Sequence, residues 1–389
     1  MVARGGAWRV PSLVCFLAGV SAIAEVSSES YLVRVIKSLE RVSADVDRMR
    51  EVAKDAAGRL IDGGTLYAAG RTSLVSELTG RAGGLMATTI LGDRTPSAGD
   101  VVLYGLEDSG AVPERIARSG ALVAAFGDAD TGDSAPAFSG YARECGISPS
   151  LASLAPAWAF TGELIAELAG AGKMPVVFET IGLPGGHPRI HQYLAKGIVY
   201  HDGSLVIGPG DSGASPGRAF LNKTRSILER VERENRIKLL QVGEWIRNAR
   251  RAGGTLYMYS MGHFPPYEIQ ATKIGDVFKP GEWNSGFHTQ RPPEDCFGPN
   301  DVVIHIGYQH PPNGLFEKAR PAGAKVVYVD ILEHRDRKDD AGVLWIDPMW
   351  PWADAVVDLP GYDIPMLPPS GIVNGAIAWE MYRLGGNSG

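Results

Sequence analysis

The pentapeptide Gly-Gly-Thr-Leu-Tyr occurs twice in this chain, at residues 63–67 and again at residues 253–257. Each copy is followed by two short apolar runs of matching sequence. These runs are Asp-Val-Val-Leu-Tyr at 100–104 and Gly-Ala-Leu-Val-Ala at 120–124, then Asp-Val-Val-Ile-His at 301–305 and Gly-Ala-Lys-Val-Val at 323–327. Corresponding runs lie 190, 201 and 203 residues apart, so the copies differ in loop length. The pattern predicts one structural unit that has been duplicated and fused.

The apolar runs predict the strands of parallel sheets. They are short, rich in Val and Leu, and separated by segments long enough for helices, which is typical of strands buried on both faces. Segments with apolar residues at helical spacing precede each copy, at 31–60 and 218–251, and another closes the chain at 371–384. The predicted fold class is therefore α/β, with two three-layer α/β/α domains. Ligands of such sheets bind outside the carboxyl ends of the strands.

The length of 389 residues suits two domains of roughly 150 residues each. We predict these domains at 25–173 and 218–389. Residues 174–217 lie between them, are rich in Gly and Pro, and carry His187, His191 and His201. This segment is predicted to form an inserted flap with short strands at 176–178 and 205–207. Its histidines fit either a structural loop or groups that a flap would bring over a cleft.

The first 24 residues allow two interpretations. Arg4 and Arg9 precede an apolar stretch at 13–24 that ends in Ala-Ile-Ala, a pattern that fits a cleaved secretory signal. The same residues also fit a loose tail ahead of the first helix, in which case the protein is cytoplasmic rather than exported. The apolar stretch is short for a membrane span, and we expect no membrane-spanning segment elsewhere.

Composition excludes several functional classes. The formal net charge is −6 and there is no long basic run, so we expect no nucleic-acid partner. Three widely spaced cysteines specify neither a zinc cage nor a disulfide framework, and no histidine spacing specifies a metal site. The Gly-x-Gly-x-x-Gly at 208–213 lacks the acidic residue that a dinucleotide site requires. We therefore expect neither a metal nor another cofactor.

Two stretches carry a resemblance to a known family. Gly-Arg-Thr-Ser-Leu at 70–74 is followed by Glu77 and by Arg-Ala-Gly-Gly-Leu at 81–85, and Ser-Met-Gly-His at 260–263 is followed by Glu268. With the order of strands and helices, these motifs resemble the SIS (sugar isomerase) family in its tandem form, over most of residues 30–385. Ala-Asp-Ala-Val-Val-Asp-Leu-Pro at 353–360 is similar to the last strand of that family.

The resemblance implies a flavodoxin-like sheet of five strands in each half, a sugar or sugar-phosphate ligand, and a homodimer. The chain also departs from the family pattern. The family carries a Ser/Thr-rich phosphate cradle after the second strand, and in both halves of this chain only Ser109 remains there as a hydroxyl donor.

The loop at 70–73 is a candidate anion site. Gly70, Arg71, Thr72 and Ser73 lie between a predicted strand and a predicted helix, where backbone N–H groups, hydroxyls and a guanidinium bind anions. The alternative is a tight turn with an ordinary helix cap and a solvated arginine.

Glu268, His263 and Glu77 are the candidate catalytic residues. Aldose–ketose isomerisation needs a base that moves a proton between adjacent carbons and a group that opens the sugar ring, and a carboxylate and an imidazole can supply these functions. Glu268 or Glu77 is the predicted base and His263 the ring-opening group. The alternative is a capping histidine with glutamates placed favourably in the first turns of helices.

Further candidate ligand contacts follow the strands of the second half. A polar cluster at the ends of these strands suits hydrogen bonding to a sugar ring, although it also fits a hydrated surface loop. Its members are Ser260, Gly262, His305, His310 and Asn313. The leading functional prediction is an isomerase of sugars or sugar phosphates that acts through an enediol. The alternative is a carbohydrate-binding or sensing protein of the same fold without catalysis.

Overall fold

The computed structural model describes residues 29–107, 110–128, 135–180, 183–201, 215–280, 296–307, 311–312, 314–331 and 342–386. The predicted signal segment, the predicted strand at 205–207, and Ser109, His310 and Asn313 lie outside these residues. Contacts divide the chain into a short unit, Met1–Ser30, and a main unit, Tyr31–Gly389, which holds both sheets and their helices. Within the described residues, no helix is long and apolar enough to cross a membrane.

The first half forms a parallel sheet. Its strands are β1 (Leu66–Gly70), β2 (Thr89–Ile90), β3 (Val101–Gly105), β4 (Leu122–Phe126) and β5 (Ala137–Phe138). Their order is β2-β1-β3-β4-β5, with parallel pairing throughout. All five residues of β3 are buried, as expected for a central strand covered on both faces.

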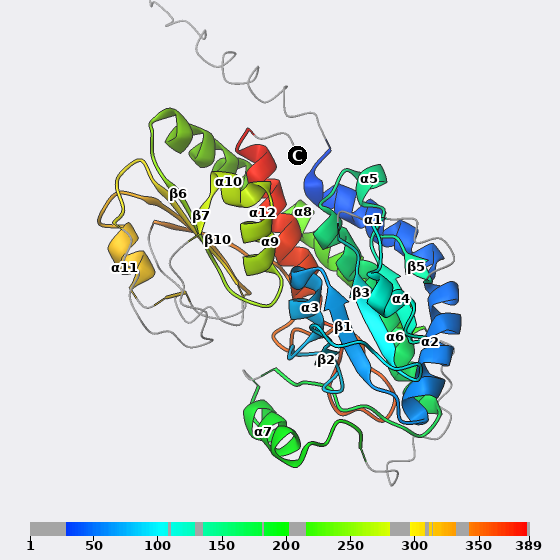
Figure 1. The fold of residues 1–389 in the computed structure, drawn as a ribbon. Helices are drawn as coiled ribbons and strands as arrows, with labels where there is room; N and C mark the ends of the chain where they lie inside the picture. Colours follow the sequence, from blue (N-terminus) through cyan, green and yellow to red (C-terminus); the bar gives the residue numbers. More distant parts are fainter. Residues whose placement is uncertain are drawn as a thin grey trace, which may run out of the picture. The chain divides into compact units, whose positions relative to one another are not determined.

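The second half repeats this sheet. Its strands are β6 (Leu256–Ser260), β7 (Lys279–Pro280), β8 (Val302–Ile306), β9 (Lys325–Val329) and β10 (Val343–Ile346). The order β10-β9-β8-β6-β7 is that of the first sheet read from the other edge. Leu66 pairs with Val101 in the first sheet, and Leu256 pairs with Val302 at the equivalent place in the second. The predicted α/β fold with two flavodoxin-like parallel sheets is confirmed (Figure 1). The predicted domain boundaries stay a prediction.

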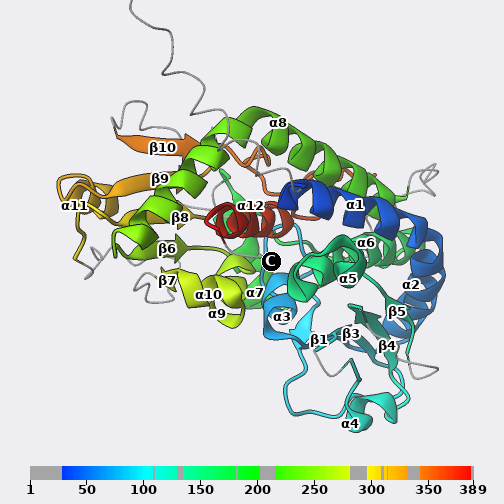
Figure 2. The same ribbon diagram turned by 90° about the horizontal axis from the view of Figure 1, so that it is seen from above.

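Helices surround the sheets, and several of them pack across the two halves. The described helices are α1 (Tyr31–Ala44), α2 (Val46–Ile61), α3 (Thr72–Leu78), α4 (Glu114–Ala117), α5 (Ala142–Cys145), α6 (Pro149–Gly170), α7 (Gly186–Lys196), α8 (Pro216–Arg251), α9 (Pro265–Ala271), α10 (Lys273–Val277), α11 (Leu315–Ala319) and α12 (Ser370–Leu384). α8 contacts α1, α6 and α12, so the halves share a layer of helices (Figure 2). α6 and α12 are buried almost all round, as their continuous apolar sequence requires.

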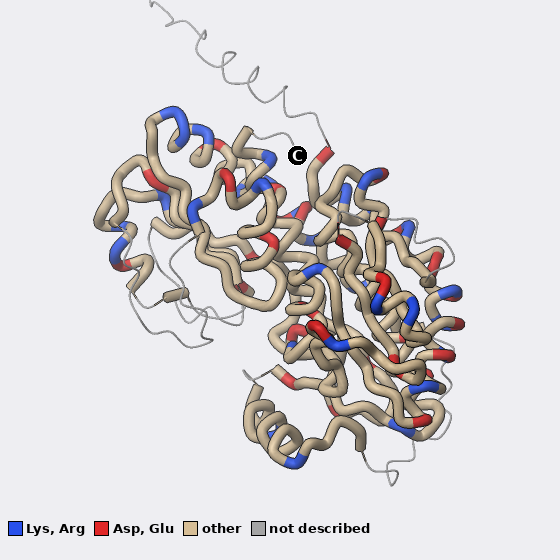
Figure 3. The backbone as a smooth tube through the Cα atoms, viewed as in Figure 1, with Lys and Arg blue, Asp and Glu red and all other residues tan. Residues whose placement is uncertain are grey.

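Charged residues of both signs are interspersed along the chain (Figure 3). On α8, for example, Arg225 pairs with Glu229 and Arg236 pairs with Glu232, each one helical turn away. This mixture agrees with the absence of a long basic run in the sequence.

Three details differ from the sequence prediction. The helix predicted at 31–60 is two helices, because the chain turns at Asp45, whose N–H bonds to the carbonyl of Val42 and whose carboxylate accepts from the hydroxyl of Tyr141. The segment predicted as a strand at 176–178 does not join either sheet. It pairs through an isolated bridge between Leu85 and Val177, and the N–H of Val176 donates to the carbonyl of Val199.

The predicted last strand at 353–360 is also wrong, because the last described strand is β10, at Val343–Ile346. Asp354 has a φ of 44°, which takes the backbone out of the extended conformation. Beyond it, Val357 makes a single antiparallel bridge with Met366.

The start of α12 packs directly against α3 of the other half. A Cβ atom on Gly371 would lie 2.2 Å from Oε1 and 2.8 Å from Cδ of Glu77. Because the carboxylate of Glu77 is fully buried, it has no room to move away. Only glycine fits at this point of contact.

We therefore expect Gly371→Ala to lower the free energy of unfolding by about 1–3 kcal/mol, which is typical of overpacking a core. Urea denaturation measures the change. Gly58→Ala is the matched control, because a Cβ on this residue of α2 would meet nothing within 4 Å, and the substitution should gain up to about 1 kcal/mol. A Gly371→Ala variant as stable as the wild type would contradict the contact.

Candidate functional site

A buried arginine connects the two halves of the chain. Arg81, just beyond α3, donates from Nη1 to Glu77 at 2.5 Å and from Nη2 to Asp354 at 2.9 Å and to the hydroxyl of Ser370 at 2.5 Å. Ser370 in turn donates from its hydroxyl and its N–H to Asp354, at 2.9 and 3.2 Å. The indole of Trp158 donates to Glu77 at 3.2 Å. We call Glu77, Arg81, Asp354 and Ser370 the Arg81 cluster.

The Arg81 cluster takes up protons near neutral pH. Burial raises the pKa of Glu77 to about 7, with a further increase from the nearby charge of Asp354 and a decrease from Arg81. Burial likewise raises the pKa of Asp354 to about 6, opposed by Arg81 and by hydrogen bonds from Ser370. One cation therefore faces two acids whose ionisation changes within the physiological range.

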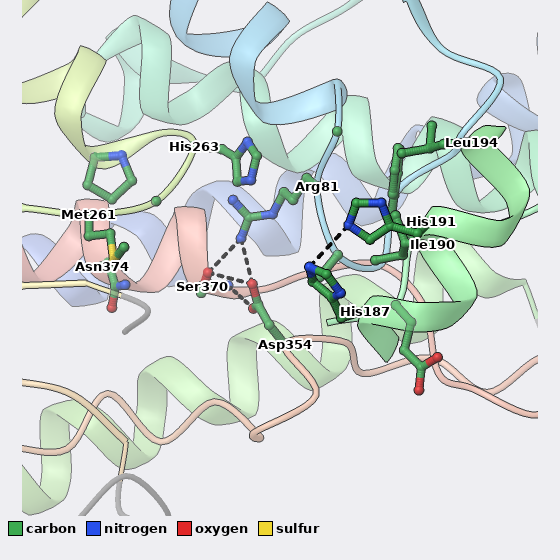
Figure 4. Close-up of a pocket in the computed structure, with 16 residues that line it drawn as sticks. Arg81, His187, Ile190, His191, Leu194, Met261, His263, Asp354, Ser370 and Asn374 are labelled. Carbon is green, nitrogen blue, oxygen red and sulfur yellow. Dashed lines mark hydrogen bonds and ion pairs between the residues drawn. The ribbon is translucent and has the colours of Figure 1, made fainter. Parts of the chain in front are cut away.

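The Arg81 cluster forms part of the wall of a cavity of about 450 Å³ (Figure 4). This volume is typical of small-molecule sites. Polar side chains in the wall include Arg81, His187, His191, His263, Asp354 and Ser370, and apolar ones include Phe178, Ile190, Leu194, Met261 and Pro265. The cavity lies where the end of α3, the loop after β6, the start of α12 and α7 of the inserted segment meet.

His263 contributes a neutral imidazole to this wall. Its pKa is lowered to about 3, first by burial and then by the charge of Arg81. Nδ1 lies 3.1 Å from the carbonyl oxygen of Ser76, and the hydroxyl of Ser76 donates to the carbonyl of His263 at 2.8 Å. A neutral ring that donates from Nδ1 carries its lone pair on Nε2. His263 can thus accept a hydrogen bond at this nitrogen.

Glu268 is buried away from the cavity wall. Its carboxylate accepts from the hydroxyl of Ser148 at 2.5 Å, from the indole of Trp379 at 2.8 Å, and from the hydroxyl of Ser150. Burial raises its pKa, and these hydrogen bonds oppose the rise. Neither Glu77 nor Glu268 is among the described residues that line the cavity.

Glu77 and Glu268 occupy equivalent places in the duplicated fold. Each lies on the helix that follows the first strand of its half, and each accepts from a tryptophan on the last helix of the same half. Each also contacts the first residues of the last helix of the other half, at Gly371 and Ser150 respectively. Both glutamates therefore help to join the halves.

The loop at 70–73 does not line the cavity. Gly70 adopts a φ of 84° and passes so close to the next strand that a Cβ would lie 2.1 Å from the carbonyl oxygen of Gly105. Arg71 donates from Nε to the carbonyl of Leu106 at 3.1 Å. Thr72 is exposed and Ser73 is buried. Anion binding at this loop stays a prediction.

The other predicted ligand contacts are only partly brought together. Gly262 lines the cavity beside His263. Ser260 ends β6 and is not among the described lining residues. His305 is fully buried in β8, where its ring lies 5.4 Å from that of Tyr328, so it packs within the sheet.

Sequence reasoning missed several residues of this wall. Arg81 was part of a recognised motif and Ser370 directly precedes the predicted closing helix, but no local pattern pairs them. Asp354 lay in a segment predicted as a strand. His187 and His191 carried a detectable signal, because residues four apart on a helix lie on one face. Among the described residues, no group of three or more His, Cys, Asp or Glu is placed to hold a metal ion.

No protein-family model matches this sequence, and no curated protein matches it. Among solved structures, the chain is similar to the C-terminal domain of glucosamine-fructose-6-phosphate aminotransferase from Francisella tularensis, with 10% identity, 93% of this chain and 98% of that chain covered, and a TM-score of 0.48. A proposed phosphosugar isomerase from Silicibacter pomeroyi matches with 12% identity, coverage of 92% and 98%, and a TM-score of 0.44.

A proposed sugar-binding protein from Salmonella typhimurium matches with 12% identity, coverage of 90% and 98%, and a TM-score of 0.43. At such identities and TM-scores, none of these proteins transfers a function to this chain.

The pKa of Glu77 predicts a specific pH dependence of stability. A carboxyl group whose pKa is raised on folding, here from 4.5 to about 7, stabilises the fold most below its unfolded pKa and loses this contribution as pH rises through 7. Asp354 acts in the same direction. His263, whose pKa is lowered from 6.5 to about 3, has the opposite effect: its contribution to stability is lost as the pH falls from 6.5 toward 3. Comparison with Glu77→Gln isolates the contribution of Glu77.

Between pH 5 and pH 8, we expect the wild type to lose roughly 3 kcal/mol of unfolding free energy relative to Glu77→Gln, at about 1.4 kcal/mol per pKa unit. Urea denaturation at each pH gives this difference. Asp358→Asn is the control, since that carboxylate is 85% exposed and should show no such trend. A difference between wild type and Glu77→Gln that stays constant with pH would refute the assignment.

Proposed function

We propose that this chain, whose two parallel sheets agree with its tandem SIS resemblance, binds a sugar or sugar phosphate in the cavity and isomerises it through an enediol. The observation that carries the proposal is the composition of the cavity wall. Asp354, with a pKa raised to about 6, and neutral His263 line the same cavity beside Arg81. Acid–base catalysis near neutral pH uses a group with a pKa like that of Asp354, and the neutral imidazole of His263 adds a hydrogen-bond acceptor beside it.

The wall suits a sugar ring in its mixture of polar and apolar groups. Arg81, Ser370 and His263 offer hydrogen-bond donors and acceptors, while Phe178 and Met261 offer apolar surface. A sugar presents hydroxyl groups around its rim and C–H groups on its faces, so it can satisfy both kinds of surface at once.

Electrostatics favours an uncharged sugar over a phosphate at pH 7 and above. The single cation of the Arg81 cluster already pairs with Glu77 and Asp354. When both acids are ionised, the cluster carries a net negative charge, which opposes binding of an anion. Protonation of the acids at lower pH reverses the sign and favours a phosphorylated ligand.

The structure supports a different base from the two glutamates that the sequence suggested. Asp354 belongs to the cavity wall, whereas Glu77 and Glu268 are enclosed by their own hydrogen bonds. In the proposed sequence the ring opens first, as the proton of the anomeric hydroxyl, which hydrogen-bonds to Nε2 of His263, passes to the ring oxygen. Asp354 then accepts the proton from the carbon next to the open-chain carbonyl, which leaves an enediolate. The remaining hydroxyl proton moves from one enediolate oxygen to the other, and Asp354 returns its proton to the neighbouring carbon, which completes the isomerisation. No oxidant or reductant is needed.

A second candidate function is binding without turnover. It is favoured by the state of Asp354, both of whose carboxylate oxygens accept hydrogen bonds from Ser370, with Oδ2 also accepting from Arg81. A carboxylate held in this way must give up one of these hydrogen bonds and contact the substrate instead before it can act as a base. A carbohydrate sensor would use the same contacts to recognise its ligand and would catalyse nothing.

A thermal-shift screen with plain and phosphorylated sugars at pH 7.5 identifies the ligand, since a ligand at 100 times its Kd adds about 2.7 kcal/mol of stability. With that ligand, Asp354→Asn should keep its affinity and lose turnover by at least about 100-fold. Asparagine has the same shape and tolerates the left-handed backbone at this position.

Asp358→Asn makes the same change at an exposed carboxylate four residues away, and it should leave both the affinity and the turnover unchanged. Binding by a wild type that shows no turnover would establish the sensor in place of the enzyme. If no sugar of either kind stabilises the protein, both functions are excluded.

A further inference from the structure

Two histidines on α7 face each other at the cavity. His187 and His191 lie four residues apart, which places them on one face of the helix. Their Nε2 atoms are 3.1 Å apart and their ring centroids 4.2 Å apart. Both line the cavity wall, and Figure 4 shows the two rings turned toward each other.

We infer that His187 and His191 form a binding site for a divalent transition-metal ion such as Zn²⁺, Ni²⁺ or Cu²⁺. Imidazole nitrogens suit these ions, and bonds from each nitrogen measure about 2.0–2.1 Å. Two nitrogens 3.1 Å apart then subtend about 95–100° at a shared ion, a value between octahedral and tetrahedral angles. The side chains need little rearrangement to bind the ion.

Without an ion, the same geometry is a hydrogen bond in which one Nε2–H donates to the other Nε2. Binding of a metal ion would release that proton and leave a lone pair on each Nε2. The ion lies beside the line between the two nitrogens, so a small rotation of the rings is enough to direct both lone pairs at it.

The helix that carries the pair is fixed to the body of the protein. Arg189, between the two histidines, forms ion pairs with Glu179 at 3.3 Å and with Asp363 at 3.0 Å. At the start of α7, a Cβ on Gly186 would lie 2.2 Å from the carbonyl oxygen of Thr180, so the helix begins in close contact with the preceding segment. The two carboxylates also offset the positive charge of Arg189, which would otherwise repel a metal ion.

Two protein ligands leave several coordination positions open. Within the described residues no third histidine, cysteine or carboxylate completes the set, so water or ligand oxygens would occupy the rest. An open site of this kind next to the Arg81 cluster would bind pairs of adjacent oxygens, such as those of a vicinal diol or a hydroxycarbonyl compound. The metal site itself depends only on α7 and not on the proposed isomerase activity.

Isothermal titration of the tag-free full chain with NiCl₂ and with ZnCl₂ tests the inference. We expect one ion per chain, and a loss of affinity of at least about tenfold in both His187→Ala and His191→Ala. Both histidines are exposed, so the substitutions should not disturb folding. Circular dichroism checks this.

The matched control is the double variant His191→Ala with Gln192→His. It keeps the number of histidines and moves the second ring about 100° around the helix, so the affinity should stay as low as in His191→Ala alone. His201→Ala should bind like the wild type. The inference is overturned if the wild type binds no ion, if removal of either histidine leaves the affinity unchanged, or if the double variant regains wild-type affinity.

Discussion

The buried guanidinium of Arg81 is the constraint on which the rest of the site depends. Arg81 lies just beyond α3 of the first half, and its side chain reaches Asp354 and Ser370 of the second, all three of them buried. Burying these charges has a large desolvation penalty, and removal of one partner of such a pair typically costs about 3–5 kcal/mol. The charges must therefore remain together. The left-handed backbone of Asp354 and the close approach of Gly371 to Glu77 are compatible with this arrangement.

The two halves, whose sheets have the same strand order, meet at two contacts that differ in chemistry. At one, Glu77 faces an arginine and an aspartate. At the other, Glu268 faces the hydroxyl groups of Ser148 and Ser150. The second contact carries a single acid that neutral donors satisfy, and it is closed off from the cavity. The first retains ionisable groups in the cavity wall. Of these two equivalent contacts, only the one around Arg81 contributes ionisable groups to the cavity wall.

The sequence predicts the sheets well because their signal is local. A buried parallel strand is a short apolar run, and the repeated order of such runs sets the topology without knowledge of distant contacts. The same information cannot place Asp354, because its partner Arg81 lies 273 residues away in the chain. A run of apolar residues around it therefore looked like a strand. Glu268 and Glu77 were correctly placed on helices after the first strands, but no sequence pattern shows that their carboxylates are enclosed.

A double-mutant cycle between Arg81 and Asp354 tests the central claim most directly. Unfolding free energies of the wild type, Arg81→Met, Asp354→Asn and the double variant would be measured by urea denaturation at pH 7.5. If the buried ion pair joins the halves, each single substitution is destabilising and the double variant recovers part of the loss, with a coupling energy of at least about 1 kcal/mol. Additive effects, with no coupling between the two sites, would contradict the account.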